Sequence, residues 1–182
     1  MRSFAAQTMR CIIILLLLAV PLFAAAAEPK TDPAAAEKID QLKKLGARLT
    51  RNDQGQIVGV NLGERRVMDA DLVHLRGLEN LEELDLTRTK ITGAGLVNIK
   101  ELPALRRLYL TDTKVDDSGI AHLQGIKTLE FLGLSGTKIT DKALDHLQEL
   151  RRLNKIFALG TGITDTGAEK LRRALPDCQI IY

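Results

Sequence analysis

A 24-residue pattern recurs along this 182-residue chain and constrains its fold more than any other feature. Each copy reads Leu-x-x-Leu-x-Leu-x-x-Thr-x-Ile or a close variant of it. The copies begin, without insertions, at Ile57, Leu81, Leu105, Leu129 and Leu153. A truncated sixth copy supplies one more strand, at 177–182. No copy can bury its own apolar face alone, so the copies must stack into one continuous core.

The second half of each copy predicts a short helix. Apolar residues recur there every three positions, as in Leu72, Leu75 and Leu78, which places them on one helix face. Residue types that cap helix N-termini precede them, as in Thr140-Asp141. A small residue stands just before the first helical apolar residue, and we expect it to let the helix approach the strand layer closely. Each copy therefore predicts a strand, a turn, a helix and a return.

This pattern resembles the leucine-rich repeat family, and most closely its 24-residue bacterial variety, related to the cysteine-containing repeats of F-box proteins. The resemblance covers about residues 57–182. It implies an α/β fold: a right-handed solenoid with short parallel strands on the concave face, helices on the convex face, and caps at both ends. Because such solenoids bind many unrelated partners, the resemblance does not name a ligand.

The ninth position of the pattern departs from that family. Many members carry Asn or Cys there, bonded to the backbone of neighbouring coils. This chain carries Thr89, Thr113, Thr137 and Thr161, while Arg65 breaks the column in the first copy. A Thr hydroxyl both donates and accepts, so we expect it to serve the same buried role.

The N-terminal segment, residues 1–27, reads as a signal peptide. Arg2 and Arg10 both come before an apolar run. Ala25-x-Ala27, after that run, is a small-residue cleavage pattern. Cleavage after Ala27 predicts a secreted or periplasmic protein without membrane insertion; the alternative is a retained anchor. A linker (28–33), a capping helix and hairpin (34–56), the repeats (57–176) and a cap strand (177–182) complete the expected organisation. Only Cys178 would then remain, as a buried thiol.

Charge and motifs exclude several functions. Removing Arg2 and Arg10 from the 26 basic residues leaves 24 against 23 acidic ones, which argues against a nucleic-acid partner. No nucleophile constellation or phosphate loop appears, so no enzyme and no cofactor are predicted. All three histidines share one repeat position, but no acidic or Cys ligand joins them, and neighbouring helices sit about 10 Å apart. We therefore expect no metal site at that column.

Alternate side chains of each strand face the concave surface. Three of the four aromatic residues beyond the signal lie there, and they predict a ligand-binding site. Gly133 should floor a shallow slot between Tyr109 and Phe157, which are about 10 Å apart by strand spacing. The candidate residues are Glu83, Asp85, Arg107, Tyr109, Phe131, Gly133, Lys155, Phe157 and Leu159. In the alternative interpretation the rings pack against one another, or against a second copy of the chain.

The predicted function is a non-catalytic module that binds a protein or peptide through the concave face. Recognition of a cell-envelope glycan, with rings stacking on sugars, is a second hypothesis. A substrate-recognition subunit of an enzyme complex is the third. An F-box-like ubiquitin-ligase role is disfavoured, because only about 29 residues would precede the first repeat after cleavage, too few for an F-box module. Ligand identity and oligomeric state stay open.

Overall fold

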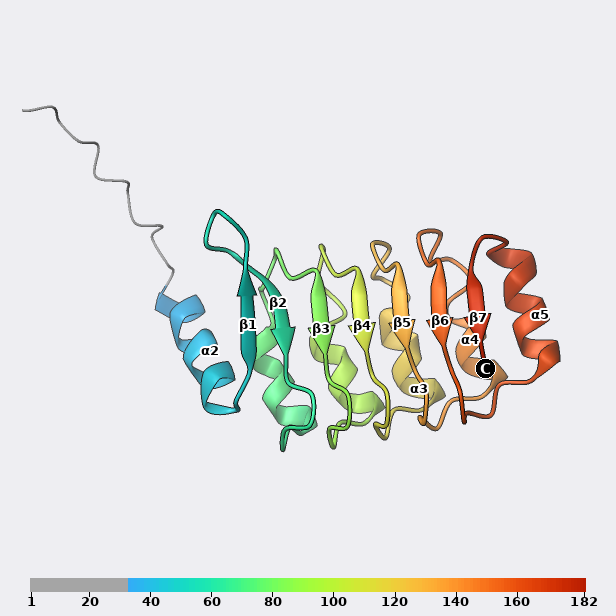
Figure 1. Ribbon diagram of the computed structural model, residues 1–182, viewed down its shortest axis with the longest axis horizontal. Helices are drawn as coiled ribbons and strands as arrows, with labels where there is room; N and C mark the ends of the chain where they lie inside the picture. Colours follow the sequence, from blue (N-terminus) through green and yellow to red (C-terminus); the bar gives the residue numbers. More distant parts are fainter. Residues whose placement is uncertain (1–32) are drawn as a thin grey trace, which may run out of the picture. The chain divides into compact units, whose positions relative to one another are not determined.

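The computed structural model describes residues 33–182 (Figure 1). The predicted signal peptide and most of the linker lie outside these residues. Among the described residues, no helix is long and apolar enough to cross a bilayer. The strands are β1 (Arg48–Arg51), β2 (Ile57–Asn61), β3 (Glu83–Asp85), β4 (Arg107–Tyr109), β5 (Phe131–Gly133), β6 (Lys155–Phe157) and β7 (Gln179–Ile181). The helical segments are α2 (Pro33–Lys44), η1 (Asp69–Leu75), η2 (Gly93–Asn98), α3 (Asp117–Ile120), η3 (Ala121–Leu123), α4 (Asp141–Asp145) and α5 (Asp165–Ala174).

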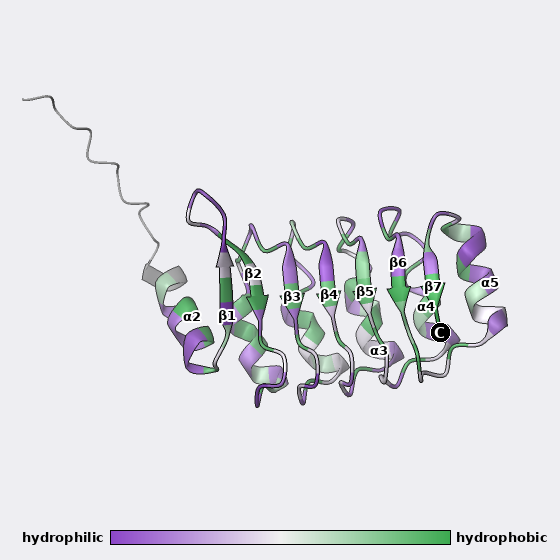
Figure 2. Ribbon diagram, in the orientation of Figure 1, coloured by the Kyte–Doolittle hydropathy of each residue, from purple (hydrophilic) through white to green (hydrophobic). Residues whose placement is uncertain are grey.

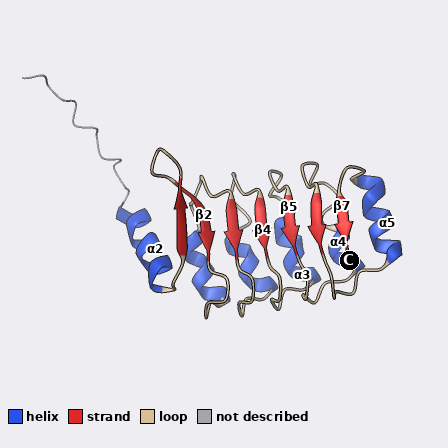
Figure 3. Cartoon of the chain, viewed as in Figure 1, coloured by secondary structure: helices blue, strands red, loops and turns tan. Residues whose placement is uncertain are grey.

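The strands form one seven-stranded sheet in the order of the chain, β1 to β7. The first pair, β1 with β2, is antiparallel, and every later pair is parallel. Each parallel pair is offset by one repeat, so Glu83 lies beside Arg107 and Arg107 beside Phe131. The helical segments lie behind one face of this sheet (Figure 3). The predicted fold class, an α/β leucine-rich repeat solenoid, is confirmed.

The core lies between the sheet and the helical segments, and the repeat leucines fill it. One column runs through the middle of the strands and is buried throughout: Val60, Leu84, Leu108, Leu132, Ile156 and Ile180. An apolar residue occupies the middle of each strand from β3 to β7, and on β3 it lies between the polar residues Glu83 and Asp85 (Figure 2). The opposite face of the sheet is left to polar and aromatic side chains, and we call it the exposed sheet face.

The threonine column is buried at Thr89, Thr113 and Thr137, but its bonds differ from our expectation. Each hydroxyl donates to the carbonyl three residues earlier in its own coil, over 2.6–2.7 Å. The expectation of bonds to neighbouring coils was wrong. Each of these hydroxyls is satisfied within its own turn, whereas another threonine, Thr128, donates to the Leu105 carbonyl of the preceding coil at 2.7 Å. The column therefore closes turns and does not join coils.

The helical segments of the first two coils follow a shorter period than those of the later coils, where α3, α4 and α5 are α-helices. In the first two coils they are 3₁₀-helices, η1 and η2. A 3₁₀-helix has three residues per turn, which matches apolar residues spaced by three. The predicted N-caps are present: the side chains of Thr92, Asp116, Thr140 and Thr164 each accept a hydrogen bond from a backbone N–H of the following turn.

Side-chain hydrogen bonds between coils include an aspartate–threonine ladder that the sequence reading missed. Asp69, Asp117 and Asp141 each accept two bonds, from the backbone N–H and the hydroxyl of a threonine 23 residues later. These bonds measure 2.6–2.8 Å. At the last coil, Asp165 accepts from the Tyr182 hydroxyl at 2.7 Å. Tyr182 thus takes the place of a further threonine, and its ring packs against the core at this end.

The ladder is interrupted once, between the second and third coils. Asp116 stands in the column of Thr92, Thr140 and Thr164, and Gly93 stands where the other coils carry Asp. A Cβ built on Gly93 would lie 2.6 Å from Asp116 Oδ1 and 2.7 Å from Gly119 Cα. The small residues before the helical leucines therefore allow the neighbouring coil to approach closely. We expected them to allow close approach of the strand layer, and that expectation was wrong.

The two ends are closed by different means. At the N-terminal end, Leu42 of α2 is fully buried, and β1 pairs with β2 along the first coil. At the other end, Cys178 is a free thiol that is only 4% exposed. Burial raises its pKa to about 11, so the thiol stays protonated at neutral pH. The expectation of a buried thiol is confirmed.

The Gly93–Gly119 contact predicts a sharp difference between two glycine substitutions. Gly93→Ala should lower the free energy of unfolding by about 2 kcal/mol, because the added methyl overlaps the neighbouring coil. Gly125→Ala should change it by less than about 0.5 kcal/mol, since its nearest neighbour would be a carbonyl oxygen 3.6 Å away. Urea unfolding followed by circular dichroism measures both. Equal stabilities would contradict this close approach of coils.

Candidate functional site

The register of the sheet brings the nine candidate residues onto the exposed sheet face in ordered rows. The first row runs across the strands as Glu83, Arg107, Phe131, Lys155 and Gln179. The second row runs as Asp85, Tyr109, Gly133, Phe157 and Ile181. Leu159 is the second residue after β6. Successive strands are about 4.8 Å apart, so each row forms a line of neighbouring side chains.

Tyr109, Phe131 and Phe157, which we call the aromatic cluster, contact one another. The ring centroids of Tyr109 and Phe131 are 4.9 Å apart, and those of Phe131 and Phe157 are 5.7 Å apart. The planes are tilted by 40° and 46°, within the geometry that aromatic pairs favour. All three side chains are partly buried. The rings form one continuous group across β4, β5 and β6.

The expected slot above Gly133 is filled. A Cβ built on Gly133 would lie 3.6 Å from Cε1 of Phe131. The ring of Phe131 therefore leans over the glycine, between the other two rings. Phe131 takes this position because its side chain packs across the strands against Tyr109 and Phe157. The cluster presents a ridge of ring edges and faces instead of a slot.

The apolar surface extends beyond the cluster toward the C-terminal end. Leu159 is 51% exposed, among the few large apolar side chains in the described chain that are so open. Ile181 is partly buried and pairs in register with Phe157. The sequence reading missed Ile181, although its place one repeat after Phe157 was the available signal. Lys155 Nζ lies over the Phe157 ring, 5.0 Å from its centroid, within cation–π distance.

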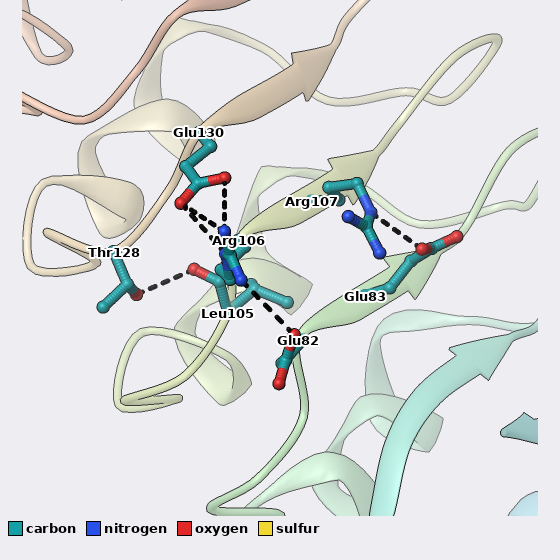
Figure 4. Close-up of polar contacts among 7 residues, drawn as sticks. All are labelled: Glu82, Glu83, Leu105, Arg106, Arg107, Thr128 and Glu130. Atoms are coloured by element: carbon teal, nitrogen blue, oxygen red, sulfur yellow. Dashed lines mark hydrogen bonds and ion pairs between the residues drawn. The ribbon is translucent and has the colours of Figure 1, made fainter. Parts of the chain in front are cut away.

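The N-terminal half of the face is polar. Arg107 Nε donates to Glu83 Oε2 at 2.8 Å, and this pair lies on the exposed sheet face (Figure 4). Beside it, Arg106 binds both carboxylate oxygens of Glu130 and lies 3.7 Å from Glu82 (Figure 4). These ion pairs link the second, third and fourth copies of the repeat, and the paired charges neutralise one another.

Asp85 differs from its charged neighbours because its bonds are to uncharged donors. Its carboxylate accepts from Asn61 Nδ2 at 2.8 Å and from the Thr87 backbone N–H at 2.9 Å. A hollow of about 270 Å³ lies beside it, lined also by Arg48 and Glu64. Small-molecule sites usually enclose about 300–1,000 Å³, so this hollow suits a contact with a larger surface.

Burial within the aromatic cluster affects the one ionisable ring in it. Burial raises the pKa of Tyr109 above its ordinary value of 10.0. The carboxylate of Glu83 raises that pKa further, because the phenolate would repel it, while Arg107 acts in the opposite direction. Tyr109 is therefore an uncharged phenol at neutral pH, available as a hydrogen-bond donor to a bound molecule.

The metal-ligating side chains in the described part of the chain are not gathered into a site. No three His, Cys, Asp or Glu side chains within residues 33–182 are grouped to hold an ion. His146 Nδ1 contacts Gln124 Nε2 at 2.5 Å, so this histidine is engaged with a neighbouring coil.

A larger hollow, of about 440 Å³, lies beside the ends of η1 and η2 and is lined by Arg76, Val97 and Leu102 among others.

Comparison with known proteins supports the leucine-rich repeat assignment. A leucine-rich repeat family model matches residues 77–100, the length of one copy of the pattern. No curated protein sequence matches significantly. The fold is similar to that of the Leptospira interrogans LRR protein LIC12759, with a TM-score of 0.50 and 21% identity over 69% of this chain and 37% of that chain.

Two further structures are more distant. An internalin (inlF) from Listeria monocytogenes gives a TM-score of 0.45 at 14% identity, over 68% of this chain and 39% of that chain. The complex PEPR1-AtPEP1 gives 0.49 at 16% identity, over 73% of this chain and 19% of that chain. This chain therefore spans well under half the length of all three structures. At these identities the likeness bears on the fold alone.

The ring contacts predict how Tyr109 titrates. In a Tyr182→Phe variant, Tyr109 is the only tyrosine left. Its phenolate should form above pH 10.0, because burial disfavours the charged form. Adding Phe131→Ala removes the covering ring and should lower that midpoint toward the ordinary value. Ultraviolet absorbance titration measures both. An unchanged midpoint after Phe131→Ala would show that Phe131 does not cover Tyr109.

Proposed function

We propose that this chain is a non-catalytic binding module that holds a protein or peptide on its exposed sheet face. The observation that carries this proposal is the gathering of apolar side chains on that face. The face supplies no core packing, since the repeat leucines point the other way. Large apolar groups grouped on an otherwise polar surface usually mark contact sites.

The geometry suits protein contact in two ways. The three rings brace one another, so binding costs little further side-chain entropy. Aromatic residues also contribute heavily to the few positions that dominate protein interfaces. In this proposal Tyr109, Phe131, Phe157 and Leu159 supply the apolar contact over Gly133. Glu83, Asp85, Arg107 and Lys155 surround it and supply polar contacts.

The remaining organisation is also proposed from the sequence. Residues 1–27 act as a cleaved signal peptide, and the mature chain is secreted or periplasmic. The family resemblance to 24-residue bacterial repeats agrees with that location. The partner is then a protein or peptide met outside the cytoplasm.

Glycan recognition is the second candidate function. Its supporting observation is that Tyr109 lies beside Asp85, whose carboxylate is already oriented by Asn61. A ring next to a fixed carboxylate and amide can stack on a sugar and accept bonds from its hydroxyls. The tilt between the rings weighs against it, because three tilted rings do not form one flat platform.

A pull-down with residues 28–182 as bait against an envelope extract tests the proposed function. The triple variant Tyr109→Ala, Phe131→Ala, Phe157→Ala should stay folded and lose its partner, because the apolar contact is gone. Protease treatment of the extract should abolish capture by the wild-type bait. Glycan digestion should abolish it instead if the second candidate is right.

A matched control removes apolar side chains elsewhere. Met68 and Val73 are 58% and 41% exposed, and neither lies on a strand of the sheet. The double variant Met68→Ala, Val73→Ala should therefore keep the partner. Circular dichroism must show the triple variant folded. A partner held equally by the wild type and the folded triple variant would move the site to the helical side or the ends.

A further inference from the structure

Two opposite charges on the exposed sheet face have no ion-pair partner among the described residues. Asp85, on β3, is bonded to uncharged donors only. Lys155, on β6, rests on the Phe157 ring and pairs with no carboxylate. The other two charges at the candidate positions, Glu83 and Arg107, neutralise each other at 2.8 Å. The face is therefore negative at β3 and positive at β6.

The distance between these two charges follows from the sheet. Lys155 leans over Phe157, which shares a row with Asp85, so both charges lie along that row. They are three strands apart, or about 14 Å at about 4.8 Å per strand. Tyr109 and Phe131 lie on the two strands between them. The order across the face is acid, aromatic rings, base.

An extended peptide matches this order and spacing. Its side chains at positions i, i+2 and i+4 point to one side, and i and i+4 are about 14 Å apart at about 3.4 Å per residue. A basic residue at i then meets Asp85, an apolar residue at i+2 covers the rings, and an acidic residue at i+4 meets Lys155. The two charges fix the direction of the segment, because the reversed orientation would place its base against Lys155 and its acid against Asp85.

We propose that the partner binds through an extended segment with the pattern basic-x-apolar-x-acidic, laid across β3 to β6. This rests on the proposed function and names the chemistry of its partner. Arg48 and Arg65 line the hollow beside Asp85, but among the described residues neither forms an ion pair with its carboxylate. Asp85 can therefore pair with a cation brought by the partner.

Two capped peptides of identical composition test the pattern against the full chain. Lys-Ser-Phe-Ser-Asp places the charges at the matching separation, and Ser-Lys-Phe-Asp-Ser brings them closer and turns them to the other side. Titration followed by NMR should show amide shifts on β3 to β6, with the first peptide binding about fivefold tighter. Equal affinities at the same site would overturn the charge pattern while leaving the proposed function standing.

A charge reversal gives the second test. Lys155→Glu should make the chain prefer Lys-Ser-Phe-Ser-Lys over Lys-Ser-Phe-Ser-Asp, the reverse of the wild-type order. Lys138→Glu is the control, since Lys138 is exposed and lies outside the strands. It should keep the wild-type order. No reversal with Lys155→Glu, or no shifts on this face with any peptide, would overturn the inference. The proposed function is tested separately by the pull-down, and it fails if the folded aromatic triple variant captures the partner as well as the wild type does.

Discussion

Hydrogen bonds between neighbouring coils hold the whole molecule in register, because each strand is too short to be stable alone. The Leu86 N–H donates to the Tyr109 carbonyl at 2.9 Å, and the Leu110 N–H donates to the Gly133 carbonyl at 2.8 Å. Hydrogen bonds also join neighbouring coils at the turns, where the Lys114 N–H donates to the Ile91 carbonyl at 3.0 Å. A chain bonded in this way repeats its geometry whenever its sequence repeats.

This register has a direct consequence for function. Because one side of every strand is committed to the leucine core, the other side is free to vary without cost to folding. The face therefore carries charges on β3 and rings on β4 to β6, although all these strands have the same backbone geometry. The binding surface we propose is built from positions that the fold does not need.

Bonds that cross from coil to coil through side chains were harder to foresee. Asp117 and Thr140 looked in the sequence like helix-start residues, and the structure places Thr140 as the N-cap of α4 and Asp117 in the first turn of α3. Their contact across 23 residues depends on how closely the coils approach, and Gly93 and Gly119 set that approach where the ladder is interrupted. The threonine column showed the opposite error, since its hydroxyls stay within their own coils.

The sequence by itself determined the repeat, the buried columns and which side chains share the exposed face, because period and alternation follow from backbone geometry alone. Only the tertiary structure decided that Phe131 covers Gly133, that Lys155 rests on Phe157, and that Asp85 is held by Asn61. The Asp85–Asn61 contact joins neighbouring coils, whereas the other two join residues of one strand whose side-chain directions depend on the coils beside it. Side-chain directions across coils depend on what fills the adjacent space, and a one-dimensional pattern carries no record of that space.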